Sequence, residues 1–139
     1  MPNFISDEWI KALCQELNKS EAYAQAAKNW EGDFYFIVEP GGEIEEQSIF
    51  YVDLWHGKCR GARLIGDEAA GKEEQPVFRM SAPLSSWRKV IKKKLDPIQG
   101  LMTRQLKLKG NMAMIMRNVK AAQELVNCCT LVPTEFPSE

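Results

Sequence analysis

Three strand patterns in the first half of the chain follow one another without an intervening helix, and this limits the possible folds more than any other feature. Residues 34–38 and 48–55 are dense in aromatic and β-branched side chains, and residues 59–65 form a weaker third pattern. Turns at residues 40–42 and at Gly57 separate them. Because parallel neighbours need long crossover connections, the three strands are predicted to form an antiparallel meander.

Two further strands are predicted in the second half. Phe78 and Met80 share one face of residues 77–81, and residues 105–109 alternate between leucine and lysine. The polar, acidic residues 66–75 are expected to form an exposed loop. The sequence therefore predicts an α/β fold of the α+β type, built on a five-stranded, mostly antiparallel sheet.

Residues 1–30 carry two helical patterns. Ser6 is a good N-cap for the first helix, which is expected to end near Asn18, and Ser20 is a good N-cap for the second, whose apolar spacing reaches Trp30. Both helices are expected to pack as lids on a larger element.

Three helical segments are predicted after the fourth strand. The first begins near Pro83, with Ser85 or Ser86 as its cap and an apolar face from Trp87 to Leu95. A short turn at 96–102 and a last helix from 112 to about 128 follow. One face of the last helix carries Met112, Ile115, Met116, Val119, Ala122 and Val126. Methionine provides an adaptable surface suited to irregular apolar ligands, but this periodicity is also typical of a packed core.

The length of 139 residues is typical of one domain, so residues 1–139 are expected to form a single domain with a frayed tail at 131–139. No stretch approaches the roughly 20 apolar residues of a membrane span. The first residues do not resemble a secretion signal, and the last do not form a peroxisomal signal. A cytoplasmic location is expected.

The four cysteines lack the spacing of metal ligands. Cys14 and Cys59 are far apart in the sequence, Cys128 and Cys129 are adjacent, and His56 is the only histidine. We expect no metal site and four reduced thiols, with a Cys128–Cys129 redox pair as the alternative.

No residue pattern predicts catalysis. His56 has no nucleophile at a recognisable spacing, and Asp53 has no second acid as a partner. No glycine-rich loop precedes a helix, as a phosphate-binding site would require. We expect no catalytic residue and no cofactor.

The net charge is −1, but the charges are segregated: residues 31–75 hold eleven acids and four bases, and residues 86–110 hold eight bases and one acid. Four basic residues of the third helix are candidates for contact with an anionic membrane: Arg88, Lys89, Lys92 and Lys93. The alternative is a solvated helix face. A near-neutral chain gives no support to nucleic-acid binding.

The second half of the sequence resembles the sterol carrier protein domain. The resemblance lies in residues 76–83, Trp87, 95–97 and 101–102, in residues 106–111 before the apolar helix, and in residues 53–57. It covers roughly residues 30–130 and implies a twisted five-stranded sheet with helices over one face. Between them the resemblance implies an apolar tunnel for fatty acyl chains, sterols or similar lipids.

The expected function is non-catalytic binding and carriage of an apolar lipid in a cavity of several hundred cubic ångströms, the usual range for ligand pockets. The residues expected to bind the ligand are Phe50, Phe78, Met80, Trp87, Ile91, Leu101, Met102, Met112, Ile115, Met116 and Val119. Two alternatives stay open: an accessory or regulatory module with a filled core, and an enzyme acting on lipid thioesters. Neither the ligand's identity nor the oligomeric state follows from the sequence.

Overall fold

The order of helices and strands follows the predicted order closely. A computed structural model describes residues 2–41, 44–65 and 75–136. Its elements are α1 (Asp7–Lys19), α2 (Glu21–Ala26), β1 (Glu31–Glu39), β2 (Ser48–Trp55), β3 (Lys58–Leu64), β4 (Phe78–Pro83), α3 (Leu84–Ile91), α4 (Pro97–Met102), β5 (Lys107–Lys109), α5 (Met112–Met116) and α6 (Val119–Cys129). The predicted 66–75 loop lies almost wholly outside the described residues.

The five strands form one sheet in the order β3-β2-β1-β4-β5. The β1–β2, β2–β3 and β4–β5 pairs are antiparallel, so the predicted meander and the mostly antiparallel sheet are confirmed. The exception is β4, which runs parallel to β1 and makes β1 the central strand. The fourth strand therefore lies beside the first, and not beside β3, which precedes it in the chain.

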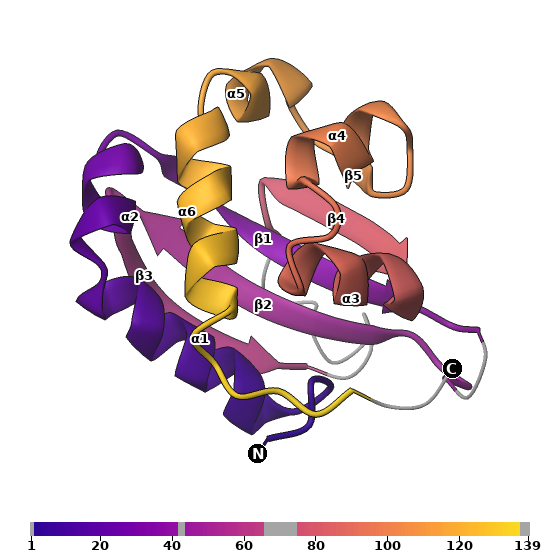
Figure 1. Cartoon of the computed structure of the whole chain (residues 1–139). Helices are drawn as coiled ribbons and strands as arrows, with labels where there is room; N and C mark the ends of the chain where they lie inside the picture. The colour runs from indigo at the N-terminus through magenta and orange to yellow at the C-terminus, as the bar shows by residue number, and fades with distance from the viewer. Residues whose placement is uncertain (1, 42–43, 66–74, 137–139) are drawn as a thin grey trace.

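The helices cover one face of the sheet, as Figure 1 shows for α6, α3 and α4. The main hydrophobic core lies between this face and the helices and runs from Phe4 to Val132. A small separate cluster of Tyr35, Ile49 and Ile65 is buried on the opposite face. The two faces follow from the alternation of side chains along β1 and β2.

Several helix boundaries differ from the prediction: α2 ends at Ala26, before Trp30, and α3 ends at Ile91, before Leu95. The third helix begins at Leu84 with Pro83 at the N-cap position, so the predicted cap by Ser85 or Ser86 is wrong. The reason is that β4 continues through Pro83 and leads directly into α3, which leaves Ser86 inside the helix and buried.

The predicted last helix is two helices, α5 and α6, separated at Asn118. In a continuous helix the Asn118 N–H would bond the carbonyl of Met114. Here the Asn118 side-chain amide donates to that carbonyl at 2.7 Å, and the backbone N–H donates to Ile115 instead. Competition by the side chain for a backbone acceptor therefore breaks the helix.

The two ends of the chain are held together. The N–H of Phe4 donates to the carbonyl of Glu135 at 2.8 Å, and the N–H of Glu135 donates to the carbonyl of Pro2 at 2.9 Å. Val132 is buried. The predicted frayed tail is thus fixed up to Phe136, and residues 137–139 lie outside the described residues.

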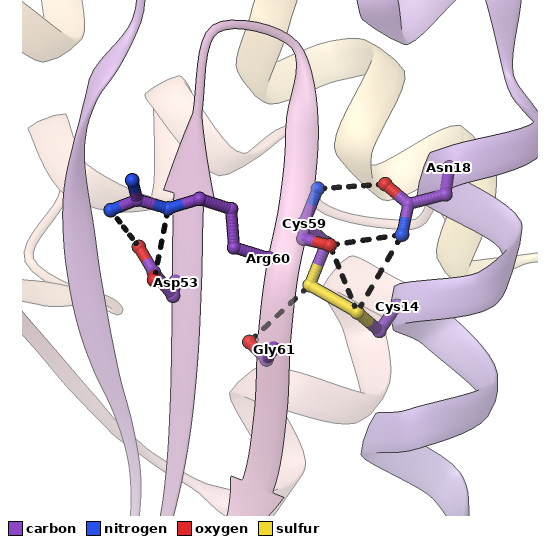
Figure 2. The surroundings of a disulfide bond; sticks show 6 residues. All are labelled: Cys14, Asn18, Asp53, Cys59, Arg60 and Gly61. Carbon is purple, nitrogen blue, oxygen red and sulfur yellow. Dashed lines mark hydrogen bonds and ion pairs between the residues drawn. A yellow bond between two sulfur atoms is a disulfide. The ribbon is translucent and has the colours of Figure 1, made fainter.

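A disulfide joins Cys14 of α1 to Cys59 of β3 (Figure 2), so the prediction of four reduced thiols is wrong for this pair. The reason is tertiary, because α1 packs along the edge strand β3. Asn18 holds the same junction: its amide nitrogen donates to the carbonyl of Cys59 at 2.9 Å, and its amide oxygen accepts from the N–H of Cys59 at 2.8 Å. Cys128 and Cys129 are free thiols.

We expect dithiothreitol to lower the free energy of unfolding in urea by about 4 kcal/mol, because reduction opens a closed loop in the unfolded chain. The two cysteines are separated by 45 residues. The variant C14S/C59A should have the stability of the reduced protein and no longer respond to reductant. Alkylation of unfolded, unreduced protein should label only Cys128 and Cys129. Four labelled thiols in freshly isolated protein would contradict the bond.

Candidate functional site

An apolar cavity lies between the inner face of the sheet and the helices that cover it. Its volume is about 110 Å³. The lining side chains come from nearly every element: Phe4, Trp9, Leu13, Tyr23, Trp30, Phe34, Phe36, Phe50, Leu54, Met80, Trp87, Val90, Ile91, Pro97, Ile98, Leu101, Leu106, Ile115, Asn118, Ala121, Ala122, Leu125, Val126 and Cys129. This volume is smaller than the several hundred cubic ångströms predicted from the sequence.

The aromatic floor of the cavity comes from the central strand and its neighbours. Phe34 and Phe36 of β1 point into the cavity, while Tyr35 between them faces the opposite side. Phe34 and Phe36 lie with ring centroids 5.1 Å apart, and Trp87 meets Phe36 edge-on at 5.6 Å. These ring contacts give the floor a fixed shape.

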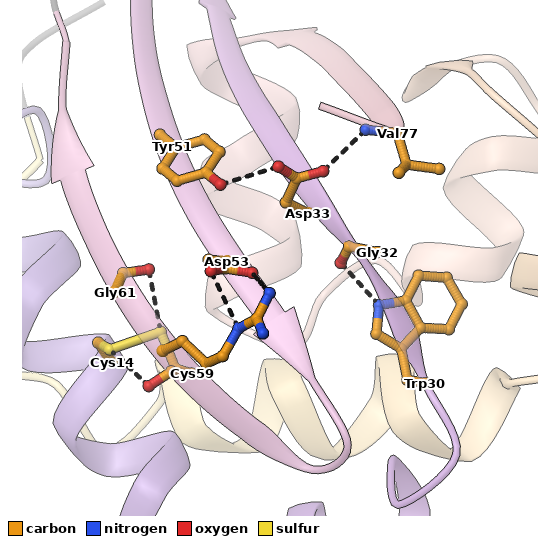
Figure 3. A network of polar contacts seen from close by, with 10 residues as sticks. Cys14, Trp30, Gly32, Asp33, Tyr51, Asp53, Cys59, Gly61 and Val77 are labelled. Atoms are coloured by element: carbon orange, nitrogen blue, oxygen red, sulfur yellow. Dashed lines mark hydrogen bonds and ion pairs between the residues drawn. A yellow bond between two sulfur atoms is a disulfide. The ribbon is translucent and has the colours of Figure 1, made fainter. Parts of the chain in front are cut away.

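The polar atoms of the three lining tryptophans are all bonded away from the cavity. The indole N–H of Trp9 donates to the Thr134 hydroxyl at 2.8 Å, that of Trp30 to the Gly32 carbonyl at 2.9 Å, and that of Trp87 to the Ile37 carbonyl at 3.0 Å. Figure 3 shows the Trp30 bond. Because each N–H is satisfied outside, the tryptophans present only carbon surface to a ligand.

The structure brings six of the predicted ligand-binding residues to the cavity wall: Phe50, Met80, Trp87, Ile91, Leu101 and Ile115. Phe78 is fully buried behind the wall, stacked on Trp30 and Phe34. Val119 is half-buried and does not line the cavity. The exposed fractions are 69% for Met102 and 38% for both Met112 and Met116, so these three methionines face outward.

Sequence reasoning missed the contribution of the N-terminal segment. Phe4, Trp9, Leu13 and Tyr23 all line the cavity, although only a lid role was predicted for their helices. A signal for this contribution was present in the sequence. The two short amphipathic helices carry several large aromatic side chains, and side chains of that size need a large apolar surface to pack against.

Two titratable groups reach the cavity, and burial keeps both neutral. Burial raises the pKa of the Cys129 thiol to about 12 and raises the pKa of the Tyr23 phenol above its ordinary value. A thiol with so high a pKa holds almost no thiolate at neutral pH, and the thiolate is the reactive form.

The polar residues considered for catalysis lie outside the cavity. Asp53 bonds Arg60 through both carboxylate oxygens at 3.1 Å, and His56 pairs with Glu31 at the end of the β2–β3 hairpin. Asp33, on the same side of the sheet, accepts from the Tyr51 hydroxyl at 2.8 Å and from the Val77 N–H at 2.9 Å (Figure 3). These carboxylates fix strands to one another.

Three of the four predicted basic residues, which lie in α3 and in the turn directly after it, have partners within the molecule. Arg88 and Lys92 both lie 5.5 Å from the centroid of the Phe136 ring, and Lys93 donates to the Asn127 side chain at 2.7 Å. Lys89 is exposed. The predicted basic surface therefore also holds the C-terminal tail.

Across residues 2–41, 44–65 and 75–136, no group of three or more His, Cys, Asp or Glu side chains could hold a metal ion. No helix in these same ranges is long and apolar enough to span a bilayer.

Comparison with known proteins gives one consistent result. The profile of the SCP-2 sterol transfer family matches residues 10–123. A crystal structure of sterol carrier protein 2 is 35% identical, with a TM-score of 0.85, and covers 94% of this chain and 100% of that one. No curated protein matches the chain.

Two other solved structures extend the comparison. A conserved hypothetical protein from Thermus thermophilus, described as possibly a sterol carrier protein, is 36% identical with a TM-score of 0.84 over 96% of this chain and 92% of that one. The apo form of sterol carrier protein 2 from Yarrowia lipolytica is 15% identical, with a TM-score of 0.56 over 86% and 88%, and shares the fold.

We expect Cys129 in the native protein to react with iodoacetamide at neutral pH at least about a hundredfold more slowly than an exposed cysteine, because its thiol is buried and protonated. The measurement is mass spectrometry of time-quenched samples, with the variant A22C as the exposed reference. Reaction of Cys129 at the reference rate would mean that the cavity wall opens readily without ligand.

Proposed function

The chain belongs to the SCP-2 sterol transfer family, and we propose that it binds an apolar lipid in the cavity between sheet and helices and carries it between membranes without chemical change. The ligand class is a fatty acyl chain, a sterol or a similar lipid.

The observation that carries this proposal is a cavity whose polar atoms are bonded outward or kept neutral. Burying ten methylene groups at about 0.8 kcal/mol each contributes roughly 8 kcal/mol, which corresponds to micromolar binding before ordering costs are subtracted. An apolar wall with few hydrogen-bonding groups favours moderate affinity for several lipids, which suits a carrier.

The cavity volume implies that the wall moves when a ligand enters. An engineered apolar cavity of roughly 150 Å³ holds one benzene molecule. The cavity of about 110 Å³ is smaller than this, so an acyl chain or sterol needs additional space. The short helices α4 and α5 contribute Ile98, Leu101 and Ile115 to the wall, and they have only six and five residues to hold these side chains in place.

A catalytic role is not favoured by the groups that face the cavity. An enzyme acting on lipid thioesters would need a nucleophile, and the Cys129 thiol is held protonated with a pKa of about 12. The accessory-module alternative needs a filled core, and the cavity of about 110 Å³ counts against it.

Carriage also requires contact with a membrane. The four predicted residues, Arg88, Lys89, Lys92 and Lys93, remain candidates, although Arg88 and Lys92 already stack on Phe136. The expected cytoplasmic location also remains a proposal. The Cys14–Cys59 disulfide weighs against a reducing compartment, because such compartments keep most thiols reduced.

The test fills the cavity and measures lipid binding. Ala121 is buried and lines the cavity, so A121F places a phenyl ring in the ligand space. We expect at least a tenfold loss of affinity for a fluorescent fatty acid, with the far-UV circular dichroism unchanged. The matched control is A22F, at an exposed position of α2, which should bind as the parent does. Equal affinity in all three proteins would contradict binding in this cavity.

A further inference from the structure

The segment that closes one end of the cavity contains no acidic residue. Between Asp96 and Glu124 the sequence holds five basic residues: Arg104, Lys107, Lys109, Arg117 and Lys120. Lys107 pairs with Glu39 and Lys120 with Glu124. In the part of the chain that the structure describes, Arg104, Lys109 and Arg117 are exposed and form no ion pair.

The same segment exposes three methionines. Met102, at the end of α4, is 69% exposed, and Met112 and Met116 of α5 are 38% exposed. Figure 1 shows α4 and α5 at the same end of the molecule, above the sheet. We call Met102, Arg104, Met112, Met116 and Arg117 the α4–α5 surface. Lys109 is not part of it, because it lies opposite Arg79 in the β4–β5 register and therefore on the other face of the sheet from Met80, which lines the cavity.

This surface is the outer side of a cavity wall. On the inner side, Leu101 precedes Met102 and Ile115 precedes Met116, and both Leu101 and Ile115 line the cavity. Leu106, between Arg104 and Lys109, lines it as well. A contact on the outer side therefore acts on the elements that must move to admit a lipid.

From these observations we propose that the α4–α5 surface docks on the surface of an anionic bilayer. Flexible apolar side chains beside unpaired cations match an interface of acyl chains below anionic head groups. A protein partner would need a surface complementary in shape, whereas mobile methionines adapt to a fluid interface. This inference rests on the proposed lipid carriage, because docking here places the cavity wall against the lipid source.

Among the described residues, the cations of the α4–α5 surface form no ion pair, whereas most of the basic residues in and just after α3 already contact other side chains. Arg88 and Lys92 hold the Phe136 ring and Lys93 holds Asn127, so a membrane must displace these contacts to use them. Arg104 and Arg117 need no such exchange. Reversal of Arg88 and Lys92 is therefore expected to weaken membrane binding less than reversal of Arg104 and Arg117.

The experiment is co-sedimentation with vesicles of phosphatidylcholine alone and of phosphatidylcholine mixed with phosphatidylserine. We expect R104E/R117E to bind the mixed vesicles at least about tenfold more weakly than the parent, since each base near an anionic surface contributes several-fold to binding. M102Q/M112Q/M116Q, which keeps the charges, should also bind more weakly. The matched control is K28E/K58E, with two exposed bases in other parts of the chain, which should lose less than about threefold.

Binding of a fluorescent fatty acid without vesicles separates this inference from the proposed function. R104E/R117E should bind it as the parent does, because these side chains do not line the cavity. Parent protein that binds mixed vesicles through this surface but binds no fatty acid would support the docking and contradict lipid carriage. Equal vesicle binding by the parent and R104E/R117E would overturn the docking, as would a larger loss in R88E/K92E, which reverses the same number of charges. Circular dichroism of each variant confirms that it is folded.

Discussion

A cavity inside a small protein stays apolar only if the polar atoms in its walls form hydrogen bonds with partners outside it. Three tryptophans line this cavity, and each indole N–H is bonded to an acceptor outside it: Thr134, Gly32 or Ile37. An unpaired N–H facing the cavity would cost on the order of 1–3 kcal/mol and would attract water. The bond to Thr134 also connects Trp9 of α1 to the C-terminal tail, so the same requirement ties the two ends of the chain together.

The walls of the cavity differ in how firmly they are held. On one side, α1 is joined to β3 by the Cys14–Cys59 disulfide and by the two hydrogen bonds of Asn18. On the other side, α4 and α5 have six and five residues, too short to be stable without packing. If the α4 and α5 side moves, the cavity can enlarge for a ligand while the sheet stays intact. The proposed carriage of lipids would depend on this asymmetry.

Much of the local structure could be predicted, because local signals agreed with the tertiary environment. Ser6 and Ser20 cap their helices as predicted, and β2 has its predicted bounds. The failures occurred where a single side chain or a distant segment decided the outcome. Asn118 divides the last helix through one hydrogen bond, and the position of α1 on β3 brings Cys14 to Cys59.

The sequence by itself determined the element order, the antiparallel meander and the apolar faces of Phe50, Met80, Trp87, Ile91, Leu101 and Ile115, because these depend on periodicity and turn chemistry within short windows. Only the tertiary structure decided which apolar residues line a cavity and which face solvent. Met112, Ile115 and Met116 share one helical face, yet only Ile115 lines the cavity. Periodicity fixes the direction of a side chain around its helix axis, whereas the break at Asn118 and the packing of α5 set where that axis lies over the sheet.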